Sequence, residues 1–226
     1  MEEELVVFNN PKSRISESIK SIRTNLQFSS IDNNIKTIMV TSSIPGEGKS
    51  FISANLACAF ADSDIKVLLI DCDLRKGRQH EIFNISNSKG LSNLLIDNVI
   101  NYKKYIKSTG YSNIKVLPAG IIPPNPSELL GSKKNKSLID LLRKDFDVII
   151  LDCPPVNGLS DALVMTSLAD AVIIVCAQNK TKISVLDDTK KALLQVNANI
   201  TGVIMNKVDL KEKNDYYRYY SDERHS

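Results

Sequence analysis

Residues 41–50 read T-S-S-I-P-G-E-G-K-S and contain the side chains whose types and spacing best fit a chemistry. A glycine-rich turn between a strand and a helix directs several backbone N–H groups at one point, where the helix dipole adds positive potential. This predicts a polyphosphate site in which Lys49 reaches the β/γ-phosphates and Ser50 ligates Mg²⁺. The usual pattern has a glycine where this chain has Ser43, so the loop alone is a moderate signal. The predicted nucleotide-binding residues of the loop are Ser43, Pro45, Gly46, Glu47, Gly48, Lys49, Ser50 and Phe51.

Three aspartates follow apolar runs further along the chain. The run K-V-L-L-I-D-C-D-L-R presents Asp71 and Asp73, and D-V-I-I-L-D-C-P-P presents Asp152 in the same way. Unbroken apolar runs are typical of strands buried on both faces of a parallel sheet, and ligands bind at the carboxyl ends of such strands. Aspartates also begin ordinary turns. Together with the loop, however, they predict a metal–triphosphate site made by Ser50, Asp71, Asp73 and Asp152.

The composition is that of an ordinary globular protein, with 226 residues, 42% of them hydrophobic and 24% charged, and it predicts one α/β domain. A net charge of +3 is too small to argue for nucleic acid as a partner. No apolar run approaches the roughly 20 residues that span a bilayer, and the start M-E-E-E lacks the layout of a signal peptide. We therefore expect a cytoplasmic protein. Four cysteines without C-x-x-C spacing are expected to be buried thiols in a reducing compartment: Cys58, Cys72, Cys153 and Cys176.

An alternation of strands and helices predicts the framework that positions these residues. After an extended start, a helix is expected at about 13–30, with apolar positions at Ile15, Ile19, Ile22 and Leu26. Strands are expected near 35–42, 66–71, 114–117, 147–152, 171–176 and 200–206, and helices near 49–62, 91–96, 136–144, 160–168 and 182–195. This order implies parallel βαβ units. With the phosphate loop it predicts the P-loop NTPase type of α/β fold, a three-layer sandwich with a mainly parallel central sheet and helices on both faces.

Residues 118–130 form a proline-rich segment, P-A-G-I-I-P-P-N-P-S-E-L-L, before the helix near 136–144. Asn125 as N-cap, Pro126 at the first helical position and Glu128 three residues after the cap predict a helix start. A functional loop and a plain surface connection are equally compatible with this segment.

The last twenty residues differ from the rest of the chain. Residues 207–226 balance five basic against five acidic residues, and they contain too few aliphatic side chains to fold alone. We expect a single P-loop domain at 1–206 and a flexible tail at 207–226. The tail contains a cluster of four tyrosines: Tyr216, Tyr217, Tyr219 and Tyr220. This cluster could be an aromatic sticking patch, a stacking surface for single-stranded nucleic acid, or a set of phosphorylation sites.

The motifs P-G-E-G-K-S, I-D-C-D-L-R, I-L-D-C-P-P and P-P-N-P-S-E-L-L, with the tyrosine cluster, resemble those of bacterial tyrosine kinases. The resemblance is to the soluble Gram-positive kinases of capsular and exopolysaccharide synthesis, and it covers nearly the whole chain. It implies an ATP-dependent protein-tyrosine autokinase, with ATP and Mg²⁺ as cofactors. Such a kinase phosphorylates its own tail tyrosines in trans and regulates polysaccharide synthesis and export.

The resemblance also implies a role for each motif residue. Lys49 neutralises the phosphates, and Ser50 with Asp152 holds Mg²⁺. Asp71 and Asp73 position the metal and accept the proton of the tyrosine hydroxyl. Asp71 is the expected base, although the sequence does not separate the two aspartates.

Two further residues are assigned in the same way. Arg75 is expected to steady the phosphates or the loop. Asn206, at the end of the strand near 200–206, is expected to contact adenine. The run N-K-V-D that begins at Asn206 also fits the guanine-recognising N-K-x-D of GTPases, but Asp152 is followed by Cys-Pro-Pro and not by the D-x-x-G pattern.

Members of this family form rings through an N-terminal helix that bears E-x-x-R-x-x-R. This chain has Glu17, Lys20 and Arg23, so lysine replaces the first arginine and loses its bidentate geometry. The resemblance further implies a membrane adaptor as activator, an opposing tyrosine phosphatase and recruitment to the inner face of the plasma membrane. Nucleic acid is not an expected partner.

Two alternatives remain beside the kinase. One is a non-kinase ATPase switch of the septum-positioning or partitioning type, which usually carries a further lysine where this chain has Ile44. Its septum-positioning members end in an amphipathic helix, and this tail has no apolar stripe. The other is a catalytically idle scaffold that binds nucleotide and a membrane partner.

Overall fold

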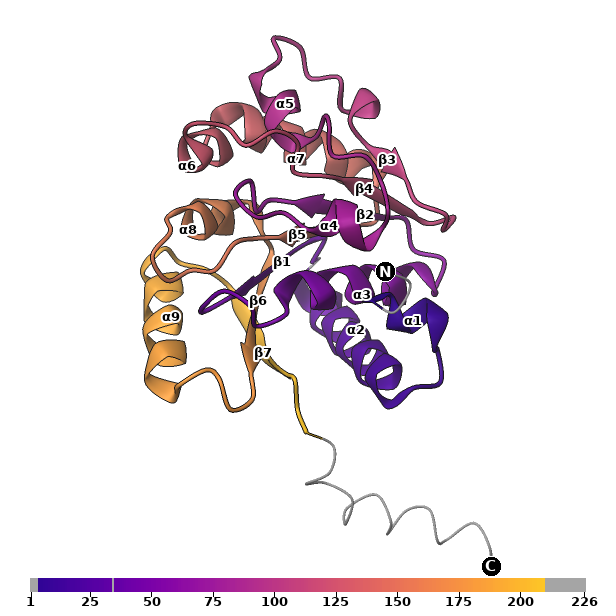
Figure 1. Ribbon diagram of the computed structural model, residues 1–226, viewed down its shortest axis with the longest axis vertical. Helices are drawn as coiled ribbons and strands as arrows, with labels where there is room; N and C mark the ends of the chain where they lie inside the picture. The colour runs from indigo at the N-terminus through magenta and orange to yellow at the C-terminus, as the bar shows by residue number, and fades with distance from the viewer. Residues whose placement is uncertain (1–3, 34, 210–226) are drawn as a thin grey trace, which may run out of the picture.

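A single seven-stranded sheet organises the protein in the computed structural model, which describes residues 4–33 and 35–209 (Figure 1). Within this part the strand order is β3-β4-β2-β5-β1-β6-β7, and every neighbouring pair is parallel except β3 with β4. The strands are β1 Thr37–Ser42, β2 Val67–Asp71, β3 Lys107–Ser108, β4 Ile114–Leu117, β5 Val148–Asp152, β6 Ala171–Ala177 and β7 Ile200–Asn206. The four tail tyrosines lie outside the described residues.

Helices cover both faces of the sheet, as the alternation of elements predicted. One layer contains α1 Val6–Asn9, α2 Arg14–Asn33, α3 Lys49–Ala61 and α4 Gln79–Ile82. The opposite layer contains α5 Leu91–Ile96, α6 Pro126–Leu130, α7 Lys133–Asp145, α8 Asp161–Met165 and α9 Ile183–Gln195. Short 3₁₀ turns lie at Tyr102–Lys104 and Thr166–Leu168. Two separate hydrophobic cores fill the spaces between these layers and the sheet, so the predicted three-layer α/β fold is confirmed.

The central strands are apolar throughout because both of their faces are covered. Every residue of β1, β2, β5 and β6 is buried, and their side chains alternate between the two cores. Val, Ile and Leu dominate these strands, as expected for a doubly covered parallel sheet. The polar residues on them occur mainly at their carboxyl ends, where the sheet meets the loops.

The N-terminal segment differs from the extended start that we expected. Residues Val6–Asn9 form the short helix α1, and the Ser16 hydroxyl donates to the carbonyls of Val6 and Asn10 at 2.9 and 2.7 Å. Because Ser16 takes this buried position, Ile15 turns outward and is 45% exposed, although it was expected to face the core. Ile19 and Leu26 are buried as predicted.

Three smaller expectations can also be compared with the structure. The helix start at Pro126 is confirmed, but the Asn125 side chain donates to the Glu128 carboxylate at 3.2 Å and makes no cap bond to the backbone. The four cysteines are buried and free, as expected. Among the described residues, no helix combines the length and the hydropathy that a membrane crossing requires.

Candidate active site

The phosphate loop joins β1 to α3 and takes a conformation that requires glycine. Gly46 and Gly48 have φ of +79° and +95°, in the left-handed region that side chains disfavour. A Cβ atom on Gly48, the N-cap of α3, would lie 2.1 Å from Nδ2 of Asn206. Ser43 occupies the position of the missing glycine. It is fully buried, and its hydroxyl has no hydrogen-bond partner among the described residues.

The Glu47 side chain braces this loop from within. Its carboxylate accepts from the backbone N–H of Ile44 at 2.9 Å and from the Thr181 hydroxyl, and the side chain is fully buried. The Asn206 amide donates to the carbonyl of Glu47 at 3.0 Å. The Glu47 carboxylate therefore binds groups of the protein itself. The backbone N–H of Glu47 is the group of this residue that could contact a phosphate. No sequence motif indicated Thr181.

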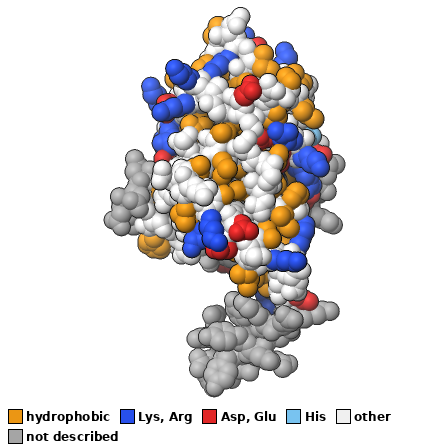
Figure 2. Space-filling view, turned by 90° about the vertical axis from the view of Figure 1, so that its left-hand side faces the viewer, with side chains coloured by type: hydrophobic (Ala, Val, Ile, Leu, Met, Phe, Trp, Pro, Cys, Tyr) orange, Lys and Arg blue, Asp and Glu red, His pale blue; other side chains and the backbone are white. Residues whose placement is uncertain are grey.

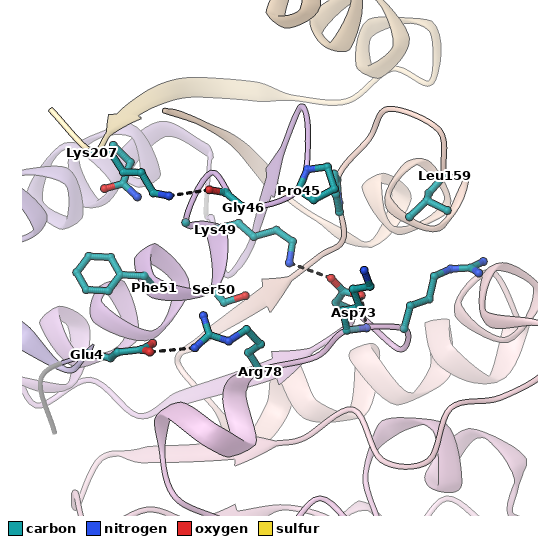
Figure 3. Close-up of a pocket in the computed structure, with 15 residues that line it drawn as sticks. Glu4, Pro45, Gly46, Lys49, Ser50, Phe51, Asp73, Arg78, Leu159 and Lys207 are labelled. Atoms are coloured by element: carbon teal, nitrogen blue, oxygen red, sulfur yellow. Dashed lines mark hydrogen bonds and ion pairs between the residues drawn. The ribbon is translucent and has the colours of Figure 1, made fainter. Parts of the chain in front are cut away.

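The root of the tail is fastened to the same loop. The ammonium of Lys207 donates to the carbonyl of Gly46 at 2.8 Å (Figure 3). Lys180 donates to the carbonyl of Pro45 at 2.8 Å. Asp209, two residues further on, is held as well, because its backbone N–H donates to the Gln178 side chain at 2.9 Å. The last residues that the structure describes thus leave the sheet beside the phosphate loop.

The predicted acidic cluster forms at the carboxyl ends of two adjacent strands. Asp71 on β2 and Asp152 on β5 are direct partners in the sheet register, and neither has exposed surface. Asp73 lies just beyond Asp71, and its Oδ2 is 2.9 Å from the ammonium of Lys49 (Figure 3). The structure therefore brings together all three aspartates and the loop lysine, as the sequence predicted.

Burial and mutual repulsion dominate the electrostatics of this cluster. Burial, and then the charge of Asp152, raise the pKa of Asp71 well above its ordinary value. Burial alone would lower the pKa of Lys49, but the carboxylates of Asp152, Asp73 and Asp71 outweigh it and raise that pKa. Lys49 is thus a permanent cation held among three carboxyl groups.

Gln79 completes the cluster, although no sequence motif pointed to it. Its side-chain Nε2 donates to Oδ2 of Asp152 at 2.8 Å and to the carbonyl of Ser50 at 3.1 Å, and its backbone N–H donates to Oδ2 of Asp71 at 3.0 Å. The Ser53 hydroxyl lies 3.3 Å from the other oxygen of Asp152. Gln79 is fully buried, so the sequence signal was only a polar residue at the first position of a four-residue helix.

The donor set fits Mg²⁺. Hydroxyl and carboxylate oxygens are the ligands that this ion prefers, and it is usually held by one or two carboxylates with phosphates and water. Asp71 and Asp152 supply two buried carboxylates, and Gln79 joins Asp152 to the backbone of Ser50. Like charges in so small a space favour a bound cation. Among residues 4–33 and 35–209, no three His, Cys, Asp or Glu side chains form a metal cage on their own.

Arg75, at the end of the I-D-C-D-L-R motif, links this motif to Asp161 at the start of α8. Its guanidinium contacts Asp161 through Nε at 2.7 Å and through a terminal nitrogen at 3.3 Å. Ser127, in α6, also donates to Asp161. Burial would raise the pKa of Asp161, but the bonds from Arg75 and Ser127 outweigh it and lower that pKa. The proline-rich segment is thereby joined to the site through Ser127.

A pocket of about 660 Å³ opens above these residues, within the range of nucleotide-sized ligand sites (Figure 3). Its walls combine the phosphate loop, the I-D-C-D-L-R motif and the start of the tail at Lys207. The lining residues are Glu4, Pro45, Gly46, Gly48, Lys49, Ser50, Phe51, Asp73, Arg75, Lys76, Arg78, Pro155, Leu159, Asn206 and Lys207. Most predicted binding residues are in this set. Asp71 and Asp152 are not, since both are fully buried.

The charged residues predicted on the N-terminal helix lie on α2, outside this pocket. Arg23 donates to the carbonyl of Ala59 at 3.2 Å and to the Ser63 hydroxyl. The ammonium of Lys20 is 3.7 Å from Asp62 and 3.8 Å from Glu17, whose side chain is 65% exposed. Lys20 and Arg23 thus have partners within the protomer.

One face of the molecule can be inspected for its charge distribution. Figure 2 shows the side that carries α9 in Figure 1, where basic, acidic and hydrophobic side chains are mixed. Proteins that bind nucleic acid usually present a continuous basic stripe or patch. This face has no such feature, in line with the small net charge.

Comparisons with known proteins agree with this geometry. The chain matches the AAA domain family over residues 35–212. CapB of Staphylococcus aureus, assigned as a tyrosine-protein kinase, is 39% identical over 97% of this chain and 96% of its own length. Tyrosine-protein kinase YwqD of Bacillus subtilis is 37% identical, with 97% and 92% covered. The crystal structure of the chimerical protein CapA2B2 superposes with a TM-score of 0.87 at 38% identity and covers 91% of this chain and 90% of that one.

More distant structures share the fold alone. Cobyrinic acid a,c-diamide synthase from Mycobacterium smegmatis, solved with bound ADP and magnesium, has a TM-score of 0.68. It is 20% identical and covers 84% of this chain and 83% of its own.

Proposed function

The chain belongs to the bacterial tyrosine kinase family, and we propose that it transfers the γ-phosphoryl group of ATP to tyrosines of its own C-terminal segment. Relatives named as tyrosine-protein kinases align with nearly its whole length at 37–39% identity, which favours a kinase over the alternative ATPase switch. The observation that carries the proposal is the contact of Lys49 with Asp73 on the wall of the pocket, directly in front of Asp71 and Asp152.

ATP and Mg²⁺ are the proposed ligands of this site. The backbone N–H groups of the loop and the ammonium of Lys49 would bind the phosphates, while Ser50 and Asp152 hold the metal with Asp71 and Asp73 beside it. When bound, Mg²⁺ neutralises charge that develops on the transferred group. Phosphoryl transfer depends mainly on positioning and charge stabilisation, which rigid strand ends provide. Asn206, on the pocket wall beside the loop, is the proposed adenine contact.

Asp71 is the proposed proton acceptor for the tyrosine hydroxyl. Its pKa is raised by burial and by Asp152, and a base works best when its pKa is near the working pH. Asp73 lines the pocket but is engaged by Lys49 at 2.9 Å, so we assign it to the positioning of that lysine. Arg75 is assigned to the steadying of the site wall, because its guanidinium is paired with Asp161.

Assembly and location follow from the family resemblance. We propose a ring in which one subunit's tail enters a neighbour's pocket, with Glu17, Lys20 and Arg23 of α2 at the contact between subunits. The exposed carboxylate of Glu17 is the group most accessible for such a contact. We also propose a membrane adaptor of the polysaccharide co-polymerase type as activator at the inner face of the plasma membrane, an opposing tyrosine phosphatase, and control of capsular or exopolysaccharide synthesis and export.

The test is a phosphorylation assay with purified protein. We would incubate the chain with Mg²⁺-ATP, with and without a fused adaptor segment, and map phosphate by mass spectrometry, with Lys49→Met as the control. Phosphate on Tyr216, Tyr217, Tyr219 or Tyr220 that disappears in the control supports the proposal. ATP hydrolysis with an unmodified tail under both conditions overturns it in favour of the ATPase switch. Competition between ATP and GTP in the same assay tests the adenine assignment.

A further inference from the structure

We infer that Gln79 is a positioning residue for the Mg²⁺ ion of this site, an inference that rests on the proposed function. Its side-chain amide contacts α3 and β5, and its backbone N–H contacts β2. Through these contacts one neutral residue links Ser50 and Asp152 by its side chain and Asp71 by its backbone, and these are the residues that we assign to the metal.

The hydrogen bonds leave only one orientation for this amide. A glutamine amide has two N–H groups, and here one points to the Asp152 carboxylate at 2.8 Å and the other to the Ser50 carbonyl at 3.1 Å. If the amide were flipped, its Oε1 would face two oxygens that can only accept. Gln79 therefore holds Asp152 by donation and is itself held by the first turn of α3.

The remaining atom of the amide points to a ligand. Oε1 of Gln79 is buried and has no hydrogen-bond partner among the residues that the structure describes. Buried acceptors of this kind are rarely left unsatisfied in proteins. Mg²⁺ usually retains several waters when it binds to proteins. We assign Oε1 to accept a hydrogen bond from a water molecule that accompanies the ion.

The chemical type of the side chain supports this role. A lysine or arginine at position 79 could also donate to Asp152, but its charge would compete with the metal for that carboxylate. The amide of Gln79 donates without adding charge, so Asp152 keeps its full attraction for a cation. Residues that hold metal ligands in this way typically change metal affinity by about 10- to 100-fold when they are replaced.

Calorimetric titration with ADP, in the presence and absence of Mg²⁺, isolates the effect on the metal. Gln79→Met removes the amide at similar size, and Gln195→Met on the exposed end of α9 is the matched control. We expect Gln79→Met to bind ADP alone as the wild type does, within about twofold, but to need about 10- to 100-fold more Mg²⁺ for the same enhancement. The control should match the wild type in both titrations. A purely structural role would weaken ADP binding with and without Mg²⁺ alike.

A wild-type Mg²⁺ dependence in folded Gln79→Met overturns the inference, as does an equal loss with and without Mg²⁺. If that variant does not fold, Gln79→Asn decides, because its shorter amide cannot span the distance from Ser50 to Asp152. The asparagine variant should also need more Mg²⁺, and an unchanged requirement overturns the inference. These titrations do not measure phosphate transfer. The proposed kinase could therefore fail with an unmodified tail while the role of Gln79 stands, or the reverse.

Discussion

The ammonium of Lys49 lies 2.9 Å from Oδ2 of Asp73, so the lysine that should bind phosphate is engaged by a carboxylate of its own site. Asp71 and Asp152 lie behind this pair and add their charge to it. The lysine is the counter-ion that allows three carboxyl groups to share a small volume. For Lys49 to bind the phosphates of an incoming nucleotide, its contact with Asp73 must break. The metal must then supply the positive charge that Lys49 no longer provides to the carboxylates.

This competition predicts the behaviour of Asp73→Asn. The variant should bind ADP without Mg²⁺ about three- to tenfold more tightly, equivalent to roughly 0.7–1.4 kcal/mol, because Lys49 is released and a repulsive charge is removed. Tail phosphorylation should nevertheless fall, by about a hundredfold, because Lys49 loses its position. Calorimetry and mass spectrometry measure the two effects, with Asp188→Asn on the exposed face of α9 as control. ADP affinity that falls or stays unchanged in Asp73→Asn would contradict the prediction.

A second prediction concerns the stability that the folded protein loses because the buried Asp71 ionises. Its pKa is raised in the folded protein, so ionisation destabilises the fold once the pH exceeds the ordinary value of about 4. Wild-type stability is therefore lost as the pH rises toward the raised pKa, whereas Asp71→Asn carries no such charge. We expect Asp71→Asn, without nucleotide or metal, to melt several degrees above the wild type at pH 8 and to keep less of this advantage at pH 5. Scanning fluorimetry at both values checks it, and an equal or lower Tm at pH 8 would count against the buried-charge interpretation.

The Arg75–Asp161 pair predicts the opposite pH trend. The pKa of Asp161 is lowered by its bonds from Arg75 and Ser127, so the stability that it contributes is present above the unfolded pKa near 4 and lost as the pH falls through the lowered value. Arg75→Met should therefore have a lower Tm than the wild type at pH 7, with the gap closing toward pH 3. The effect should be small, since the Arg75 side chain is 41% exposed. A gap independent of pH would show that lost packing, not charge, is responsible.

The glycine conformation of the loop gives a further prediction. Gly48→Ala places a Cβ 2.1 Å from Asn206 at φ of +95°, so it should cost about 1–3 kcal/mol and weaken nucleotide binding. Gly202→Ala on β7 is the matched control, because nothing lies within 4 Å of the added carbon. Chemical denaturation and ADP titration measure the two variants. Equal stability of both variants would contradict the loop geometry described above.

The fold and the acidic cluster could be predicted because their signals are local. Buried parallel strands are continuous apolar runs, and the aspartates Asp71 and Asp152 follow them immediately. The helix start at Pro126 was equally readable from its own residues. By contrast, the turn that makes α1 depends on the Ser16 hydroxyl, six to ten residues away, and a serine inside a helical pattern gives no such indication.

The residues that were missed all act across long sequence distances. Gln79 contacts Asp152 over 73 positions, and Thr181 contacts Glu47 over 134. Neither contact follows from periodicity or from a turn preference, because each exists only when the strand ends have been brought side by side. Arg75 was predicted as part of the site, but its partner Asp161 was not, for the same reason.

Lys207 and Asp209 are held beside the phosphate loop, and this attachment limits how far from the loop a tail tyrosine can lie. Tyr216 follows Asp209 by seven positions, and a fully extended chain of seven residue steps spans no more than about 25 Å. A pocket that phosphorylates Tyr216 must therefore lie within this distance of Asp209 in the chain that carries the tyrosine. A neighbouring subunit can satisfy this limit only if its pocket lies within about 25 Å of this Asp209, so the length of the tail restricts which arrangements of subunits allow phosphate transfer between them.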